Sequence, residues 1–347
     1  MSGLRVAIVG CGRIGTKRVD ALRGQDVLVG CHDLDKHAAA SLARRHRARV
    51  CATLEQLLAL TPDVVVVASS HERLAEFAER SLEHGAHVLV EKPAGISTAQ
   101  IDHLIARRDA SGLLVKVGFN HRFHPALART YRELRSGACG ELLHLRARYG
   151  HGGRLGYERE WRADPARAGG GELIDQGMHL LDLSHWLAGP LPLHAALLRT
   201  QFWQVPVEDN AALILGEADA RSGPWALLHV SWTEWRNMFS LEVYCRRAKL
   251  AVDGLAGSYG HQRLRVYRME PELGPPTLEE IVYPDEDVSW REEWRQFAEA
   301  IAADGRPLLL GELEDARYAW AQVESAYAST PYAAMREQLL GGVEAIP

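Results

Sequence analysis

The first third of the chain alternates short apolar runs with longer amphipathic stretches. The apolar runs, typical of strands buried on both faces, cover residues 4–9, 27–31, 64–68, 88–90 and 113–117. The spacing of apolar residues predicts helices over 13–23, 35–46 and 98–108, and one more after Ser69. Ser69 and Glu72 have the spacing of a capping box for that helix. The alternation predicts an α/β fold with a doubly wound parallel sheet, the Rossmann arrangement.

The pattern changes after Phe119. Helices are expected over 125–136, 173–187, 290–302 and 312–328, and strands over 141–149, 193–202, 211–215, 225–232 and 239–245. A glycine-rich stretch over 150–171 is a candidate substrate lid. Consecutive strands separated by short turns predict a mainly antiparallel sheet, and hence an α+β second domain. At 347 residues the chain is long enough for two domains, expected at 1–120 and 121–347.

Composition excludes several classes of partner. The formal net charge of -5 provides no basic field for nucleic acid. No apolar run approaches the length that spans a bilayer. The five cysteines are odd in number and lack CxxC spacing, so we expect neither a disulfide framework nor a zinc knuckle, and a reducing cytoplasm fits best.

The turn after the first strand, Gly10-Cys11-Gly12-Arg13-Ile14-Gly15, matches the dinucleotide fingerprint GxGxxG. In this pattern Gly10 permits the tight turn, Gly12 lets the backbone approach a pyrophosphate, and Gly15 allows close helix–strand packing. Asp33 follows the second strand, where a carboxylate accepts hydrogen bonds from the ribose hydroxyls and repels a 2′-phosphate. NAD is therefore favoured over NADP. Asp33 could instead begin the next helix, a role that Asp35 could share.

A second group of chemical residues follows later strands. Lys92 lies beyond the apolar run that ends at Val90, and ligands of open α/β sheets bind beyond the carboxyl ends of the strands. Asp175 and His179 are four residues apart on an expected helix, with Asp182 on the same stripe. Histidine suits the base of an alcohol oxidation, a carboxylate can orient it, and lysine can stabilise a developing alkoxide. Taken singly, Asp175 and His179 could be only a helix pair and Lys92 a surface residue.

The glycine-rich stretch also carries aromatic and arginine side chains. Tyr157 or Trp161 could stack on a sugar ring, and Arg162, like Arg154 and Arg159, could bind a carboxylate or phosphate. A solvated loop anchored by a buried Trp161 is the alternative. No set of histidines combines ligand spacing with a carboxylate partner in the sequence, so no metal site is expected.

Five segments in order resemble the glucose-fructose oxidoreductase and inositol dehydrogenase family (Gfo/Idh/MocA). They cover residues 7–15, 87–95, 117–127, 169–183 and 207–210. The resemblance implies an N-terminal Rossmann domain and a C-terminal domain whose large open sheet often forms an oligomer interface. It also implies catalytic roles at Lys92, Asp175 and His179. In the family, Glu91 and Lys92 would lie near the nicotinamide, and Asn120 and Arg122 would follow the last Rossmann strand at the interdomain cleft. With the candidates named above, the expected cofactor contacts are Gly10, Gly12, Arg13, Ile14, Gly15, Asp33, Ser69, Glu91 and Lys92, and the expected substrate contacts are Asn120, Arg122, Tyr157, Trp161 and Arg162. Ser69-Ser70 departs from the threonine-proline pair that is usual in the family.

Together these features predict an NAD-dependent oxidoreductase. The reaction would move a hydride between the cofactor and a secondary alcohol or ketone of a sugar, amino sugar, nucleotide sugar or cyclitol. Two alternatives are an NAD-dependent glycoside hydrolase that works by transient oxidation and elimination, and a non-catalytic dinucleotide sensor. We expect a homodimer or homotetramer formed through the C-terminal sheet, and no nucleic acid or membrane partner.

Overall fold

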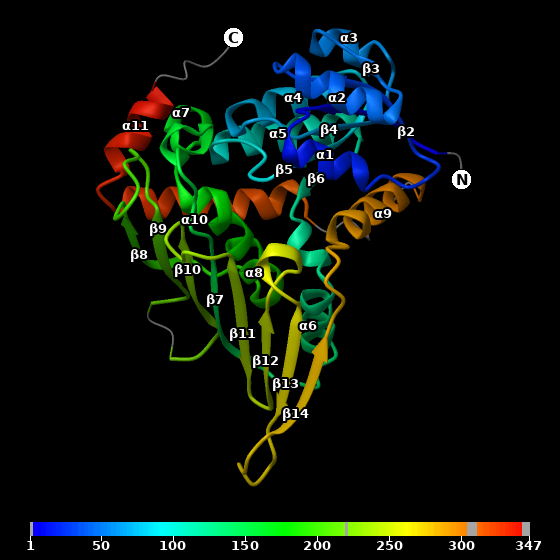
Figure 1. Ribbon diagram of the computed structural model, residues 1–347. Coiled ribbons are helices and arrows are strands. Elements are labelled where there is room, and N and C mark those ends of the chain that lie inside the picture. The colour runs from blue at the N-terminus through cyan, green and yellow to red at the C-terminus, as the bar shows by residue number, and fades with distance from the viewer. Residues whose placement is uncertain (1–2, 219–220, 304–310, 342–347) are drawn as a thin grey trace. The chain divides into compact units, whose positions relative to one another are not determined.

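The structure is a computed structural model that describes residues 3–218, 221–303 and 311–341. The chain divides into two compact units. Unit 1 is Met1–Asn120 with Ser289–Arg317, and unit 2 is His121–Val288 with Tyr318–Pro347. Each unit is built around its own sheet (Figure 1).

Unit 1 contains a six-stranded parallel sheet in the order β3-β2-β1-β4-β5-β6. Its strands are β1 (Arg5–Val9), β2 (Val27–His32), β3 (Arg49–Val50), β4 (Val64–Val67), β5 (His87–Glu91) and β6 (Val115–Gly118). Its helices are α1 (Arg13–Asp20), α2 (Lys36–His46), α3 (Leu54–Leu58), α4 (His71–Glu83), α5 (Thr98–Ser111) and α9 (Ser289–Ala302). The doubly wound parallel sheet predicted from the sequence is confirmed.

The strands of unit 1 are apolar because both faces of the sheet are covered. All four valines of β4 are at most 1% exposed, which explains why that strand has no polar alternation. The order β2-β1-β4-β5 brings the ends of β1, β2 and β5 to one edge. The glycine turn, Asp33 and Lys92 follow these three strand ends, so all three stand at that edge.

One local prediction in unit 1 is wrong. The N-cap of α4 is Ser70 rather than Ser69, and its side chain caps no backbone amide. The Ser70 hydroxyl donates instead to the Glu72 carboxylate at 2.8 Å, so the two side chains bind each other and no capping box forms.

Unit 2 contains an eight-stranded sheet in the order β14-β13-β12-β11-β7-β10-β9-β8. Its strands are β7 (Leu142–Gly150), β8 (Leu193–Arg199), β9 (Asn210–Leu215), β10 (Trp225–Ser231), β11 (Met238–Cys245), β12 (Ala248–Asp253), β13 (Arg263–Arg268) and β14 (Thr277–Val282). Every neighbouring pair is antiparallel except β7 and β10, which are parallel. The mainly antiparallel sheet is confirmed, although the last three strands were not expected.

Helices cover one face of this sheet, where α8 contacts β7 and β10. The longer helices of unit 2 are α6 (Pro125–Arg135), α8 (Met178–Ala188) and α11 (Ala333–Gly341). Helix α10 (Leu313–Ala328) belongs to both units, because the division between them falls after Arg317. The expected helix over 173–187 begins as a π-helix, η4 (Leu173–Gly177), before continuing as α8. Among the described residues, no helix has the length and apolarity required to cross a membrane.

The segment between β7 and η4 is more ordered than the expected open loop. It contains two 3₁₀ turns, η2 (Tyr157–Arg159) and η3 (Trp161–Ala163), and the short helix α7 (Pro165–Ala168). Asp164 caps α7 by accepting from the Ala166 amide at 3.0 Å. Local capping and turn bonds therefore give this stretch a defined backbone.

Candidate functional site

The glycine turn has the geometry of a dinucleotide site. Gly10 has φ +91°, and a Cβ there would lie 2.3 Å from the Ala68 carbonyl oxygen. A Cβ at Gly15 would lie 1.9 Å from the Gly10 carbonyl oxygen, so both positions require glycine. At Gly12 a Cβ would meet nothing within 4 Å, and no side chain caps α1 at this residue. The helix therefore presents its first amides to an open approach, which fits a diphosphate.

Asp33 and Asp35 have separate roles in the structure. Asp35 is the N-cap of α2 and accepts from the amides of His37 and Ala38. The Asp33 carboxylate accepts from the Cys11 amide at 2.5 Å and the Asp35 amide at 2.7 Å. Asp33 therefore lies directly beside the glycine turn, and the capping role belongs to Asp35.

Glu91 belongs to a buried charge network that the sequence did not reveal. Arg18 donates to Glu91 at 2.5 Å and also pairs with Glu293 of α9, while Lys116 lies 3.4 Å from Glu293. Burial raises the pKa of Glu91, and the Arg18 guanidinium opposes that rise. The network holds the end of β5, and Lys92 is the next residue along the chain. Glu91 therefore has a structural role that does not depend on any contact with a cofactor.

The other residues expected near the cofactor are at the surface of unit 1 or close to it. Arg13 is exposed, whereas Ile14, Ser69 and Lys92 are half-buried. The Ser69 hydroxyl donates to the Ser70 carbonyl at 3.2 Å. The peptide bond between Lys92 and Pro93 is cis.

In unit 2 the glycine run before η4 packs against protein. A Cβ at Gly170 would lie 2.0 Å from the Tyr327 hydroxyl, and one at Gly171 would lie 2.1 Å from the Glu208 carbonyl oxygen. The buried Glu208 carboxylate accepts from the Leu173 amide at 3.0 Å and the Tyr327 hydroxyl at 2.7 Å. The space beside the backbone at Gly170 and Gly171 is therefore filled by Tyr327 and Glu208. Glu208 is thus a positioning residue for η4 that sequence reasoning missed.

His179 lies in a cluster of rings on unit 2. Its imidazole stacks on that of His121 with centroids 3.8 Å apart, and Tyr149 approaches both rings edge-on. His179 is 7% exposed, so its environment is largely protein. Asp175 belongs to the π-helix η4 and His179 to α8. The four-residue spacing between them therefore does not lie on one regular α-helix, as was expected from the sequence.

Two residues expected to bind substrate make firm contacts with protein. Asn120 donates to the Ser289 hydroxyl at 2.9 Å within unit 1. Arg122 forms a buried pair with Asp182, with Nε 3.0 and 3.1 Å from the two carboxylate oxygens. Asp182 is therefore committed to Arg122, and a substrate role for either Asn120 or Arg122 stays a prediction.

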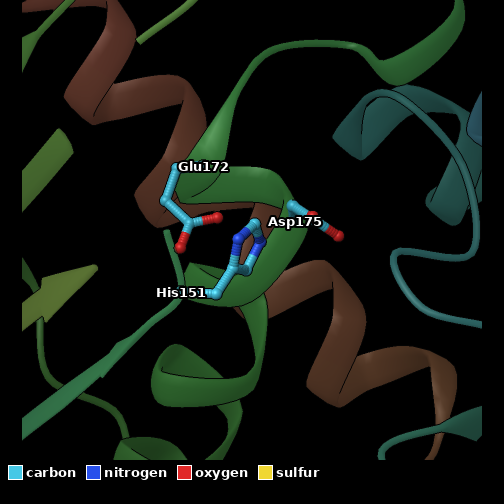
Figure 2. Close-up of side chains that lie close together, drawn as sticks. All are labelled: His151, Glu172 and Asp175. Atoms are coloured by element: carbon cyan, nitrogen blue, oxygen red, sulfur yellow. The ribbon is translucent and has the colours of Figure 1, made fainter. Parts of the chain in front are cut away.

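Three ligand-type side chains meet at the end of β7 in unit 2. His151, Glu172 and Asp175 each place a nitrogen or oxygen within 4.8 Å of the other two, and the imidazole lies between the carboxylates (Figure 2). Arg162 lies 3.3 Å from Asp175. This cluster could not be found from sequence spacing, because His151 is more than twenty residues from its partners. The expectation of no metal site was drawn from the spacing of histidines and did not consider this cluster of metal-type ligands.

The two aromatic candidates differ in exposure. Tyr157 is 2% exposed and packs against Trp232 and Val207, whereas Trp161 is half-buried with the Arg162 guanidinium over its ring. Arg154 and Arg159 are exposed, and Arg154 pairs with Glu160 at 2.7 Å. Substrate contacts from Tyr157, Trp161 and Arg162 stay predictions, and stacking on a bound ring is easier at Trp161.

Two models of one protein family match the chain in succession. The model described as an oxidoreductase family with an NAD-binding Rossmann fold matches residues 4–119, and the Gfo/Idh/MocA C-terminal domain matches residues 128–251.

Individual relatives are sugar dehydrogenases. Levoglucosan dehydrogenase of Pseudarthrobacter phenanthrenivorans is 28% identical over 47% of this chain and 43% of its own length. D-Glucoside 3-dehydrogenase of Escherichia coli is 31% identical over 54% of this chain and 55% of its own. The chain thus aligns with about half the length of these curated relatives. The crystal structure of GenD2 from gentamicin A biosynthesis, in complex with NAD, superposes with a TM-score of 0.80 at 26% identity, covering 96% of this chain and 95% of that one.

Proposed function

The chain belongs to the Gfo/Idh/MocA oxidoreductase family, and from this premise we propose that it is an NAD-dependent dehydrogenase or reductase. The substrate would be a secondary alcohol or the matching ketone of a sugar, amino sugar, nucleotide sugar or cyclitol. The observation that carries the proposal is the glycine turn with Asp33 bound to its Cys11 amide, in the unit that also bears Lys92. The sugar dehydrogenases among the relatives support the substrate class.

NAD, when bound, would supply the acceptor for the hydride. The open amides at Gly12 and the start of α1 would hold its diphosphate, and Asp33 would accept from its adenosine ribose. A 2′-phosphate would meet the Asp33 carboxylate, so NADP is disfavoured. Arg13, Ile14, Ser69 and Glu91 are proposed as further contacts.

The chain's own residues handle the proton and the developing charge. We assign His179 as the base that takes the hydroxyl proton, because imidazole titrates near neutrality. For Lys92 we propose a hydrogen bond to a substrate oxygen, which would stabilise alkoxide character on that oxygen. Asp175 would orient the base, and Asn120, Arg122, Tyr157, Trp161 and Arg162 would line the substrate.

We also propose that the protein works as a homodimer or homotetramer formed through the sheet of unit 2. A cytoplasmic location is proposed because its five cysteines are all buried free thiols, the state that a reducing compartment maintains.

The test measures cofactor binding and turnover separately. Calorimetric titration with NAD should give binding, and a panel of myo-inositol, methyl glucosides, amino sugars and UDP-N-acetylglucosamine should yield NADH with at least one member. His179→Ala should lower turnover by about 100-fold or more while leaving NAD affinity nearly unchanged. NAD binding without turnover of any alcohol would contradict the dehydrogenase and favour a sensor. Glycoside cleavage without net NADH would favour the hydrolase.

A further inference from the structure

The cluster at the end of β7 contains His151, whose backbone and ring are both held by contacts with neighbouring residues. The backbone of His151 is bonded on both sides, its amide donating to the Ser231 carbonyl at 3.0 Å and its carbonyl accepting from the Glu234 amide at 3.2 Å. The ring packs edge-on against Tyr157 with centroids 5.7 Å apart. Because Tyr157 belongs to a buried aromatic cluster, the imidazole has little freedom to turn.

One backbone contact also selects the tautomer of this ring. The Gly153 amide donates to His151 Nδ1 at 2.9 Å. A nitrogen that accepts a hydrogen bond carries no proton, so the neutral ring must carry its proton on Nε2. Burial lowers the pKa of His151, which favours this neutral form. The ring therefore offers an Nε2–H donor to its surroundings.

The imidazole lies among two carboxylates and one guanidinium. The side chains of Glu172 and Asp175 lie on either side of the imidazole (Figure 2), no ligand atom being more than 4.8 Å from the others. Glu172 is fully buried, and Asp175 is half-buried with Arg162 Nε 3.3 Å from its Oδ2. A displacement of about 1–2 Å brings a donor from that separation to hydrogen-bond distance.

We propose that His151 is a positioning residue: its Nε2–H donates to the Asp175 carboxylate and, together with Arg162, holds that carboxylate in its working orientation. This inference rests on the proposed function, in which Asp175 in turn orients the base His179. Asp175 would then be held from both sides, by a neutral donor and by a cation.

A divalent cation is the competing occupant of the cluster. The three ligand atoms lie close enough that a point exists within about 2.8 Å of all of them, not far from coordination distances. Two observations favour the donor. With Nδ1 bound to Gly153, the nitrogen left over carries a proton and has no lone pair for a metal. Arg162 already supplies a positive charge to Asp175.

The first experiment needs no substrate. In protein labelled with nitrogen-15 histidine, the His151 signal is assigned by its loss in His151→Gln. We expect the spectrum of a neutral ring protonated on Nε2, unchanged by a stoichiometric amount of ZnCl₂ or MnCl₂. A ring protonated on Nδ1, or a His151 signal that shifts or broadens on adding either metal, would overturn the proposal. This readout holds even if no alcohol is ever turned over.

The second experiment uses the panel alcohol that wild-type protein oxidises fastest. His151→Ala should lower kcat by about tenfold or more while leaving NAD affinity unchanged. His151→Gln places an amide N–H near the position of Nε2–H and should retain kcat within about threefold. His151→Asn, whose amide reaches only to the position of Nδ1, should resemble the alanine variant. His194→Ala, an exposed histidine on β8, is the matched control and should behave as wild type.

Each outcome separates the alternatives. Equal loss in the glutamine and asparagine variants would show that a donor at Nε2 is not what matters, and the proposal would fail. Wild-type kcat in all three variants would remove His151 from the site. If no panel alcohol is oxidised while the histidine spectrum is as expected, the dehydrogenase assignment fails and the tautomer assignment stands.

Discussion

At the scale of single residues, carboxylates decide what the chain can bind and how its parts are held. Asp33, Glu91, Glu208 and Asp182 each accept from a specific donor. All four donors are backbone amides or buried guanidinium groups, and no short sequence spacing reveals such pairings. Among these four, only Asp33 could be placed beside the glycine turn by a general rule of dinucleotide sites, because it follows the second strand.

The two acids at the end of β2 allow a matched test of cofactor recognition. Asp33→Ala removes the acceptor beside the glycine turn, so we expect the Kd for NAD to rise by about tenfold and the preference for NAD over NADP to shrink. Asp35→Ala removes only the cap of α2 and should cost about 1 kcal/mol of stability without changing that preference. Calorimetric titration of both variants with both cofactors gives the comparison. Unchanged affinities in Asp33→Ala would show that the ribose is recognised elsewhere.

At the scale of elements, strong periodic patterns were predictable and contacts between distant segments were not. The valine-rich β4 and the amphipathic α4 follow from residues within one window of sequence. The π-helix η4 could not be predicted in this way, because Glu208 and Tyr327, more than thirty residues away in the sequence, hold it. The Glu-Asp pair at 208–209 serves two segments at once: Glu208 binds the start of η4, and Asp209 accepts from the amides of residues 201–203. Residues of the candidate site could thus be named from motifs, while what orients them could not.

The buried Glu208 makes the stability of η4 sensitive to pH. Burial raises the pKa of Glu208 to about 7, against 4.5 as its ordinary value. Between these two values the unfolded chain releases the proton that the folded protein keeps, so the contribution of Glu208 to stability falls as pH rises from about 4.5 to 7 and is level above. Glu208→Gln cannot titrate and retains an acceptor oxygen. Its Tm relative to wild type should therefore be more favourable at pH 8 than at pH 5.

Glu208→Ala is the control for the hydrogen bonds themselves. It removes the buried carboxylate to which the amides of Gly171 and Leu173 donate. Because neither variant titrates at this position, Glu208→Ala should be about 1–3 kcal/mol less stable than Glu208→Gln at every pH. Thermal unfolding of the three proteins at both pH values distinguishes the two effects. A Tm difference between Glu208→Gln and wild type that does not vary with pH would mean that Glu208 does not titrate in this range.

At the scale of the whole molecule, the sheet of unit 2 has one face that no helix covers in the part of the chain that the structure describes. Along β10 the side chains alternate, and Ala226, Leu228 and Val230 are buried whereas Trp225 and Leu227 are 43% and 39% exposed. The register places Leu227 between Ile214 and Arg146 in one row across the sheet. A second row stacks Trp225, His144 and Tyr244, with centroids 4.8 and 4.3 Å apart. The exposed face is thus apolar toward β9 and β10 and charged toward β11.

An exposed apolar area on a regular sheet is what a second copy of the chain can cover, and this supports the proposed oligomer. Leu227→Glu places a second carboxylate beside Arg146, whose guanidinium already pairs with Glu242. It should shift the protein to a smaller species, because burying a further charge in this largely apolar area is unfavourable at an interface. Light scattering coupled to size-exclusion chromatography measures the mass directly. Leu273→Glu, at an 80% exposed position in the turn before β14, is the matched control and should leave the mass unchanged. If Leu227→Glu folds and keeps the wild-type mass, any assembly must use another surface, and a monomeric wild type would remove the oligomer altogether.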